Sequence, residues 1–224
     1  MNASRFDPGD NILLGNGCEI DPGAVLGYLT GRRIDNLTLH IGPGARIRAG
    51  TVIYAGSTIG AGLETGHSVV IREENTIGDH LNIWNNSTID YGCTIGNEVK
   101  IHCNVYVAQF TTLEDEVFLA PGVTIANDPH PICGLCMRGP TIRRGARIGV
   151  NVTLLPQIVV GEGALVGAGS VVTRDIPPQT LAYGNPARPV RTVDELPCPF
   201  EMVERAYVQG MDVRAQQAAE RSLS

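Results

Sequence analysis

The chain has 224 residues, 43% of them hydrophobic, which is ordinary for a soluble globular protein of one or two domains. Its formal net charge of −6 argues against non-specific nucleic-acid binding, and no apolar run approaches the roughly 20 residues of a membrane span. The first residues do not resemble a secretory signal, so the six cysteines are predicted to be reduced thiols of a cytoplasmic protein.

The first predicted elements are three short strands. Leu14, Ile20 and Leu26 recur at intervals of six residues, which indicates the start of a repeat. The next residue of the pattern, Ile41, comes fifteen positions after Leu26. We therefore predict an insertion over residues 27–40, with the sequence GRR near its tip.

The stretch from Ile41 to Ile125 keeps the six-residue interval without interruption. We call the residues at these positions anchors, and fourteen of the fifteen are Ile, Val or Leu, the exception being Thr65. An α-helix cannot keep a period of six, because it has 3.6 residues per turn. The pattern instead predicts one short strand and one corner per repeat, with three strands forming a triangular coil of about 18 residues. Neighbouring coils then bury one another's apolar faces.

The six-residue interval between anchors is interrupted a second time after Ile125. The next anchor follows seventeen positions later, so residues 128–141 are predicted to form a loop that leaves the prism, where functional residues concentrate. The interval then resumes, and the last six anchors are Ile142, Ile148, Leu154, Val160, Val166 and Val172. The 24 anchors predict about eight coils and, at about 4.8 Å per coil, a prism roughly 38 Å tall.

The C-terminal part begins where proline interrupts the repeat. The sequence IPPQT at 176–180 is predicted to end the prism, because proline cannot donate to a strand ladder. An ordered turn is predicted over 184–191, and residues 199–221 have the apolar spacing of a helix. The predicted fold is thus all-β, a parallel β-helix domain over 1–183 followed by a turn and a short α-helical tail over 184–224.

Stacked coils place residues eighteen positions apart next to each other on the surface. Three polar columns follow from this: Glu73, Tyr91, Gln109 and Asn127; His67, Asn85 and Cys103; and Asn86 with Asn104. They are predicted to face outward, and the first runs to the loop that begins at Asp128. Asparagine ladders also occur as simple corner structure, since asparagine tolerates left-handed backbone conformations, so both interpretations remain open.

A family resemblance rests on the hexapeptide array and on the run IGVNVTLLPQIVVGEGALVGAGSVVTRDIPPQTLAYGNPARPV at 148–190. Over nearly its whole length the chain resembles the hexapeptide-repeat acyltransferases with a left-handed β-helix. Residues 101–128 are similar to nucleotide-sugar N-acetyltransferases that act on amino sugars. The resemblance implies a homotrimer that binds acetyl-CoA between two prisms and acetylates the amino group of a nucleotide-linked amino sugar.

Acyl transfer from a thioester needs a neutral nucleophile and a group that takes its proton. His130, in the inserted loop, is the first candidate for this base, because its His-Pro sequence resembles the catalytic histidine of sugar O-acetyltransferases on this fold. Asn127 matches an asparagine of the amino-sugar enzymes, which implies that it hydrogen-bonds the acceptor sugar or orients its amine.

Further candidates bind the two substrates. The acceptor groove is predicted to be lined by His67, Asn85, Asn104 and Gln109, although His67 also fits a simple exposed corner histidine. The candidates for CoA are Gly167 and Ala168, which match family positions where the backbone approaches the pantetheine arm, and Arg174 and Arg188, for the phosphates. Either arginine is equally compatible with a solvated surface position.

The inserted loop also contains a potential metal site. His130, Cys133 and Cys136 have a spacing plausible for zinc ligands, with Asp128 or another subunit as a fourth. The alternative is a pair of reduced loop thiols without metal. If zinc is bound, His130 is a ligand rather than a base.

Other functions are compatible with the same prism. Within acyltransferases, the acceptor could be a sugar hydroxyl or an amino acid. A γ-type carbonic anhydrase would need three zinc-binding histidines, and the chain lacks the close histidine pair of that family. A purely structural β-helix would not bind CoA, and the GNPAR turn and the polar loop argue against it.

Overall fold

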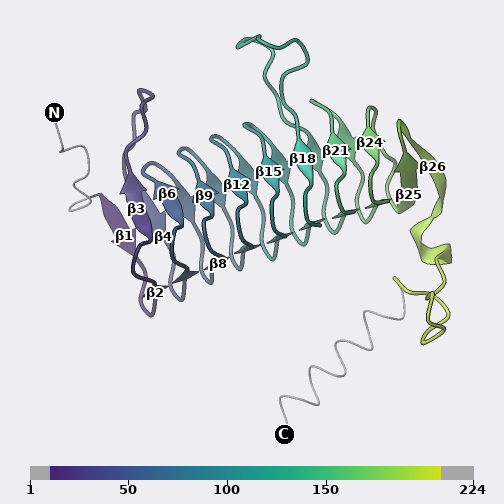
Figure 1. Cartoon of the computed structure of the whole chain (residues 1–224), viewed down its shortest axis with the longest axis horizontal. Helices are drawn as coiled ribbons and strands as arrows, with labels where there is room; N and C mark the ends of the chain where they lie inside the picture. Colours follow the sequence, from purple (N-terminus) through teal and green to yellow (C-terminus); the bar gives the residue numbers. More distant parts are fainter. Residues whose placement is uncertain (1–10, 208–224) are drawn as a thin grey trace, which may run out of the picture.

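The structure is a computed structural model and describes residues 11–207. Its main body is a prism of stacked triangular coils whose three faces are parallel sheets (Figure 1). Each of the strands from β1 to β24 contains one anchor, which confirms the predicted all-β repeat with eight coils. We call the sheets the first, second and third face, in the order in which the chain visits them.

The faces are built from very short strands. The first face contains β1 (Ile12–Leu14), β4 (Leu39–Ile41), β7 (Thr58–Ile59), β10 (Thr76–Ile77), β13 (Thr94–Ile95), β16 (Thr112–Leu113), β19 (Thr141–Ile142) and β22 (Val159–Val160). The second contains β2 (Glu19–Ile20), β5 (Arg46–Ile47), β8 (Glu64–Thr65), β11 (Asn82–Ile83), β14 (Lys100–Ile101), β17 (Phe118–Leu119), β20 (Arg147–Ile148), β23 (Leu165–Val166), β25 (Thr180–Gly184) and β26 (Ala187–Thr192). The third contains β3 (Val25–Tyr28), β6 (Val52–Tyr54), β9 (Val70–Ile71), β12 (Thr88–Ile89), β15 (Tyr106–Val107), β18 (Thr124–Ile125), β21 (Thr153–Leu154) and β24 (Val171–Val172). A short 3-10 helix, η1 (Val193–Glu195), follows β26.

The interior of the prism holds the anchors. Every anchor from Ile41 to Val172 is at most 3% exposed, and burial of one such Ile, Val or Leu side chain contributes about 1.5–3 kcal/mol. Leu14 and Ile20 remain 44% and 39% exposed, because their coil has a neighbouring coil on only one side within the described residues. The core therefore depends on stacking, as the repeat predicts.

The corners turn through left-handed backbone conformations. Eight non-glycine corner residues, each separated from the next by six or twelve positions, have φ between 56° and 61°: Ser68, Glu74, His80, Asn86, Glu98, Asn104, Phe110 and Glu116. Gly92 takes the same place in its corner, where an added Cβ would come within 2.9 Å of the Phe110 ring. Asn86 and Asn104 are thus part of the corner structure of the prism.

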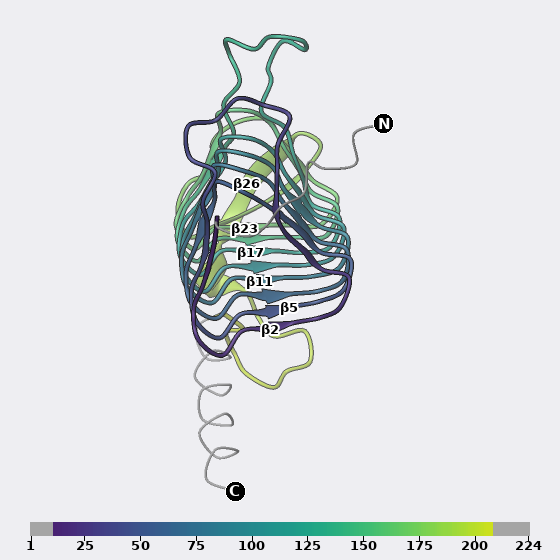
Figure 2. The same cartoon turned by 90° about the vertical axis from the view of Figure 1, so that its left-hand side faces the viewer.

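Two insertions interrupt the corners without disturbing the stack. Leu14 pairs with Ile41, 27 positions later, so the first insertion adds nine residues to an 18-residue coil. Leu113 pairs with Ile142, 29 positions later, so the second adds eleven. Both leave the prism between the third and the first face and rise from the same side of it (Figures 1 and 2).

The C-terminal region departs from the sequence-based expectation. The boundary predicted between residues 183 and 184 falls inside a hairpin of β25 and β26, and β25 pairs with β23 of the second face. The helix predicted over 199–221 is not formed over 199–207, where the chain makes turns, and residues 208–221 lie outside the described part. Helical spacing alone does not stabilise a short segment, because most helical stability comes from tertiary packing. Residues 11–207 contain no helix with the length and apolar character to cross a membrane.

Candidate active site

The two insertions share one edge of the prism. We call it the insertion edge, and it consists of the connections between third-face and first-face strands: residues 29–38, 55–57, 72–75, 90–93, 108–111, 126–140 and 155–158. The first insertion does not project freely over its whole length. A Cβ on Gly56 would lie 2.6 Å from the carbonyl oxygen of Asn36, so the chain of the insertion lies directly against the next corner.

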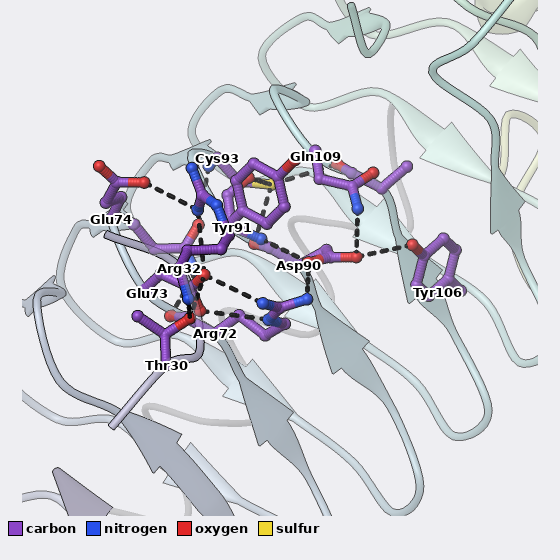
Figure 3. A network of polar contacts seen from close by, with 12 residues as sticks. Thr30, Arg32, Arg72, Glu73, Glu74, Asp90, Tyr91, Cys93, Tyr106 and Gln109 are labelled. Carbon is purple, nitrogen blue, oxygen red and sulfur yellow. Dashed lines mark hydrogen bonds and ion pairs between the residues drawn. The ribbon is translucent and has the colours of Figure 1, made fainter. Parts of the chain in front are cut away.

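Glu73 is a fully buried carboxylate at the centre of this edge. It accepts hydrogen bonds from Thr30 Oγ1 at 3.0 Å, from Arg32 Nη1 at 3.0 Å, and from Arg72 Nε and Nη2 at 3.1 and 3.0 Å (Figure 3). Burial alone would raise the pKa of Glu73, but the backbone N–H and the bonds from Arg32, Arg72 and Thr30 outweigh it and lower the pKa. The charged form is therefore the stable one.

Arg32 fixes the first insertion over this carboxylate. Its guanidinium also bonds Glu74 at 2.9 Å and lies 3.7 Å from the ring centre of Tyr91. The Tyr91 ring in turn makes an edge-to-face contact with Phe110 at 5.5 Å between centres. An ion pair and a cation–π contact thus hold the loop 29–38 against the prism.

Asp90 is a second, nearly buried carboxylate one coil further along. Arg72 Nη1 lies 3.3 Å from its Oδ1, while its Oδ2 accepts from Tyr106 Oη at 2.8 Å and from Gln109 Nε2 at 2.6 Å (Figure 3). Burial and the bond to Asp90 raise the pKa of Tyr106, which keeps the phenol protonated as a donor. Asp90 therefore links Arg72 to Gln109.

The Asp90 carboxylate fixes the orientation of the side-chain amides of Gln109 and Asn127. An ionised carboxylate only accepts hydrogen bonds, so the Gln109 group that faces Asp90 must be its NH₂. Gln109 Oε1 then points to Asn127, whose Nδ2 donates to it at 2.7 Å. The Oδ1 of Asn127 accepts no hydrogen bond from residues 11–207 and remains an acceptor at the base of the second insertion.

The predicted column is thereby formed, with one correction. Glu73, Tyr91, Gln109 and Asn127 do lie in successive coils, and the backbone N–H of Phe110 donates to the Tyr91 carbonyl across two of them. Glu73, however, is 0% exposed rather than outward-facing, because the first insertion covers it. The column is a chain of contacts and not an open polar strip.

The second insertion carries His130, Cys133 and Cys136 on an exposed loop. The ligand atoms of these three side chains lie within 4.8 Å of one another. Asp128 organises the loop, since its Oδ1 accepts from the backbone N–H of His130 and its Oδ2 from that of Cys133, both at 2.8 Å. The structure therefore brings together the three residues that the sequence indicated as metal ligands.

The remaining predicted acceptor residues lie on a different edge. His67, Asn85 and Asn104 belong to corners between the second and the third face, whereas Gln109, Asn127 and His130 belong to the insertion edge. Asn85 Oδ1 accepts from the backbone N–H of His67 at 2.8 Å, and His67 Nδ1 lies 3.3 Å from the carbonyl of Ala49. A single chain does not bring the two groups of residues together.

The predicted CoA residues are placed as follows. Gly167 and Ala168 share the edge of Asn85, and a Cβ on Gly167 would lie 2.8 Å from the Cβ of Tyr183. Gly167 thus allows the packing of β25. Arg174 and Arg188 are exposed and, among residues 11–207, have no acidic partner; Arg188 Nη1 bonds the carbonyl of Ala187 at 2.9 Å.

Sequence reasoning missed Arg32, Arg72, Asp90 and Tyr106. A signal was present, because Arg72 and Asp90 each follow an anchor directly, are eighteen residues apart and carry opposite charges. A depression of about 570 Å³ elsewhere on the surface, lined by residues that include Glu114, Arg143, Glu162 and Asp175, contains none of the predicted site residues.

The fold and its edge define a class of protein, the β-helices built from hexapeptide repeats. The sequence matches the family described as bacterial transferase hexapeptide (six repeats) over residues 92–127 and 139–174. The hexapeptide repeat of succinyl-transferase matches residues 74–109. The chain thus resembles the hexapeptide-repeat transferases over residues 74–127 and 139–174, and most of the inserted loop lies between these two segments.

Solved structures share the left-handed β-helix. A UDP-N-acetylglucosamine acyltransferase from Bacteroides fragilis is 23% identical with a TM-score of 0.57, covering 79% of this chain and 73% of that one. One from Campylobacter jejuni is 18% identical with a TM-score of 0.52, covering 78% and 75%. The galactoside O-acetyltransferase of Escherichia coli is 36% identical over 91 residues, which are 38% of this chain and 45% of that protein. The chain spans less than half the length of the curated relatives it matches.

Proposed function

We propose that the protein is an acetyl-CoA-dependent acyltransferase that acetylates the amino group of a nucleotide-linked amino sugar. The observation that carries the proposal is the fixed amide of Asn127 at the base of the inserted loop. Its Oδ1 faces no donor within residues 11–207 and is available to an N–H or O–H of an acceptor. The matches to hexapeptide transferase repeats support a thioester as the acyl donor.

Asn127 and His130 have complementary roles in this reaction. Asn127 Oδ1 accepts one N–H of the neutral acceptor amine, which directs the lone pair of the nitrogen toward the thioester carbon. The new C–N bond forms and the C–S bond breaks. The His130 imidazole takes the proton that the nitrogen loses and returns it to the departing thiolate, which gives the acetylated sugar and CoA.

A hydroxyl acceptor is the second candidate, and His130 is the observation that favours it. A sugar hydroxyl needs a base more than an amine does, and His130 is the one histidine of the insertion edge among the described residues. The partial match to the galactoside O-acetyltransferase of Escherichia coli points the same way. Asn127 Oδ1 could accept from a hydroxyl in the same position.

A homotrimer would unite the two edges that one chain separates. If the insertion edge of one copy faced the second-to-third edge of the next, Asn127 and His130 would meet His67 and Asn85. Gly167 and Ala168, on that second edge, would then place the pantetheine arm near the acceptor, with Arg174 and Arg188 for the CoA phosphates. Analytical ultracentrifugation tests this arrangement, and a monomer that is fully active would contradict it.

The substrate is tested by mixing the protein with acetyl-CoA and measuring free thiol release over a panel of acceptors. The panel contains nucleotide-linked amino sugars, the same nucleotide sugars with a hydroxyl at the amino position, and simple galactosides. We expect the amino sugars to give the highest kcat/KM. Highest turnover on a hydroxyl would replace the N-acetyl proposal by the O-acetyl one. No calorimetric binding of millimolar acetyl-CoA would refute both.

A further inference from the structure

The loop 126–140 contains a set of soft ligands that the acyl-transfer proposal does not use as a group. One imidazole and two thiols have their ligand atoms within 4.8 Å of one another. Thiolate and imidazole ligands select zinc and related soft cations over magnesium or calcium, and catalytic zinc sites commonly have three protein ligands. The loop therefore has the ligand types and the number that such an ion requires.

The chain also holds these ligands in position. Asp128 bonds the backbone N–H groups of His130 and Cys133 with its two oxygens, which joins the first two ligands through one rigid carboxylate. The backbone N–H of Cys136 lies 3.4 Å from the carbonyl of Cys133, which closes a tight turn between the thiols. Oriented supporting groups of this kind are a regular feature of metal sites.

The two thiols supply the charge that such an ion requires. Metal ligation requires the deprotonated form of cysteine, so a cation held by Cys133 and Cys136 would be bound by two negatively charged sulfurs.

We propose that His130, Cys133 and Cys136 form a binding site for a zinc ion on the exposed second insertion. Binding would release two thiol protons and leave one of the four tetrahedral positions for a water molecule or an added ligand. Asp128 is not part of this ligand group, and its two oxygens instead accept from the backbone N–H groups of His130 and Cys133.

Metal binding would control the base of the proposed reaction. An imidazole that coordinates a cation through one nitrogen keeps its proton on the other and cannot accept a proton from the acceptor. Zinc would therefore inhibit acyl transfer, and removing zinc would restore it. This consequence rests on the proposed function, whereas the metal site itself rests on the loop geometry alone.

The site is tested with cobalt(II) on the full-length protein, purified with a chelator and kept in a phosphine reductant. We expect one equivalent of cobalt to produce the near-ultraviolet band of thiolate-to-cobalt charge transfer and the intense visible bands of four-coordinate geometry, and zinc to abolish both. Absence of the thiolate band at saturating cobalt would overturn the proposal.

Four variants and a control locate the site. Cys133→Ser, Cys136→Ser and His130→Ala should each weaken zinc affinity more than about 100-fold, because loss of a supporting residue alone costs about 10–100-fold. Asp128→Asn, which retains one of two backbone bonds, should weaken it about tenfold. Cys198→Ser changes a thiol outside the loop and should leave affinity unchanged. Equal affinities in Cys133→Ser and Cys198→Ser would refute the assignment.

The activity arm separates the two proposals. Acyl transfer by the metal-free protein should fall on zinc addition, and the Cys133→Ser/Cys136→Ser variant should lose this sensitivity. A cobalt thiolate spectrum from a protein without transferase activity would support the metal site and refute the proposed function. Activity that is unaffected by one bound equivalent of zinc would overturn the inhibitory role.

Discussion

The two insertions leave the same edge of the prism, add similar numbers of residues, and yet are held in opposite ways. Loop 29–38 lies against the corner at Gly56 and is fixed by the ion pairs of Arg32 to Glu73 and Glu74. Loop 126–140 is organised mainly from within by Asp128, and its Ile132 and Leu135 side chains are 103% and 99% exposed. The first insertion thus supports the edge, and the second exposes its side chains to solvent.

Breaking the support of the first insertion should have the largest effect. Glu73→Gln removes the charge that faces Arg32 and Arg72, so we expect the free energy of unfolding to fall by about 3 kcal/mol, at the lower end for a broken buried pair because the arginines are partly exposed. The matched control, Glu74→Gln, alters an exposed pair and should cost less than about 1 kcal/mol. Urea unfolding measures both, and equal losses would contradict the central position of Glu73.

The same substitution gives a pH test. The pKa of Glu73 is lowered in the folded state, so its contribution is present above the unfolded pKa and is lost as the pH falls through the folded value. Wild type should therefore lose more stability than Glu73→Gln as the pH is lowered from about 5 to below 4. Parallel stability profiles for the two proteins over this range would show that Glu73 makes no such contribution.

The chain of contacts that ends at Asn127 should affect catalysis more than stability. Gln109→Glu places a second carboxylate beside Asp90 and should lower kcat about 10–100-fold through misplacement of Asn127. Asp90→Asn combined with Gln109→Glu again places a donor opposite an acceptor between positions 90 and 109 and between positions 109 and 127. This double variant should recover most of the lost kcat. Steady-state kinetics with acetyl-CoA tests this, and a double variant as slow as Gln109→Glu would refute the directional argument.

Loosening the first insertion at its surface should have a smaller effect. Arg32→Ala removes the contact with the Tyr91 ring and the ion pair of Arg32 with Glu73. We expect the free energy of unfolding to fall by about 1 kcal/mol. Arg33→Ala, the neighbouring exposed arginine, is the control and should change stability by less than about 0.5 kcal/mol. Hydrogen exchange should accelerate in residues 29–38 of Arg32→Ala, and unchanged exchange there would show that the arginine does not fix the loop.

The smallest effect is expected in the second insertion. Ile132→Ser and Leu135→Ser remove fully exposed side chains and should change the free energy of unfolding by less than about 0.5 kcal/mol. Thermal unfolding of the two variants provides the measurement. A loss above about 1 kcal/mol would mean that this loop packs against something, and the contrast between the insertions would disappear.

The repeat could be predicted from sequence because stacked coils force one apolar residue to the interior every six positions. The common origin of the insertions could also be predicted, since Leu26 and Ile125 are the third and eighteenth anchors and both therefore belong to third-face strands. The burial of Glu73 under the first insertion could not be predicted, because it depends on how Thr30 and Arg32 fold back across two coils. The turns at 199–207 were missed because apolar spacing does not reveal whether a helix has a surface to pack on.

The 18-residue coil has a geometric consequence for the spacing of the two loops. They leave coils one and six, five coil rises apart, or about 24 Å along the axis. One whole coil added or removed between them would shift this separation by about 4.8 Å and leave both loops facing the same direction. The axial distance between the first and the second insertion can therefore change only by whole coil rises, if both loops are to face the same direction.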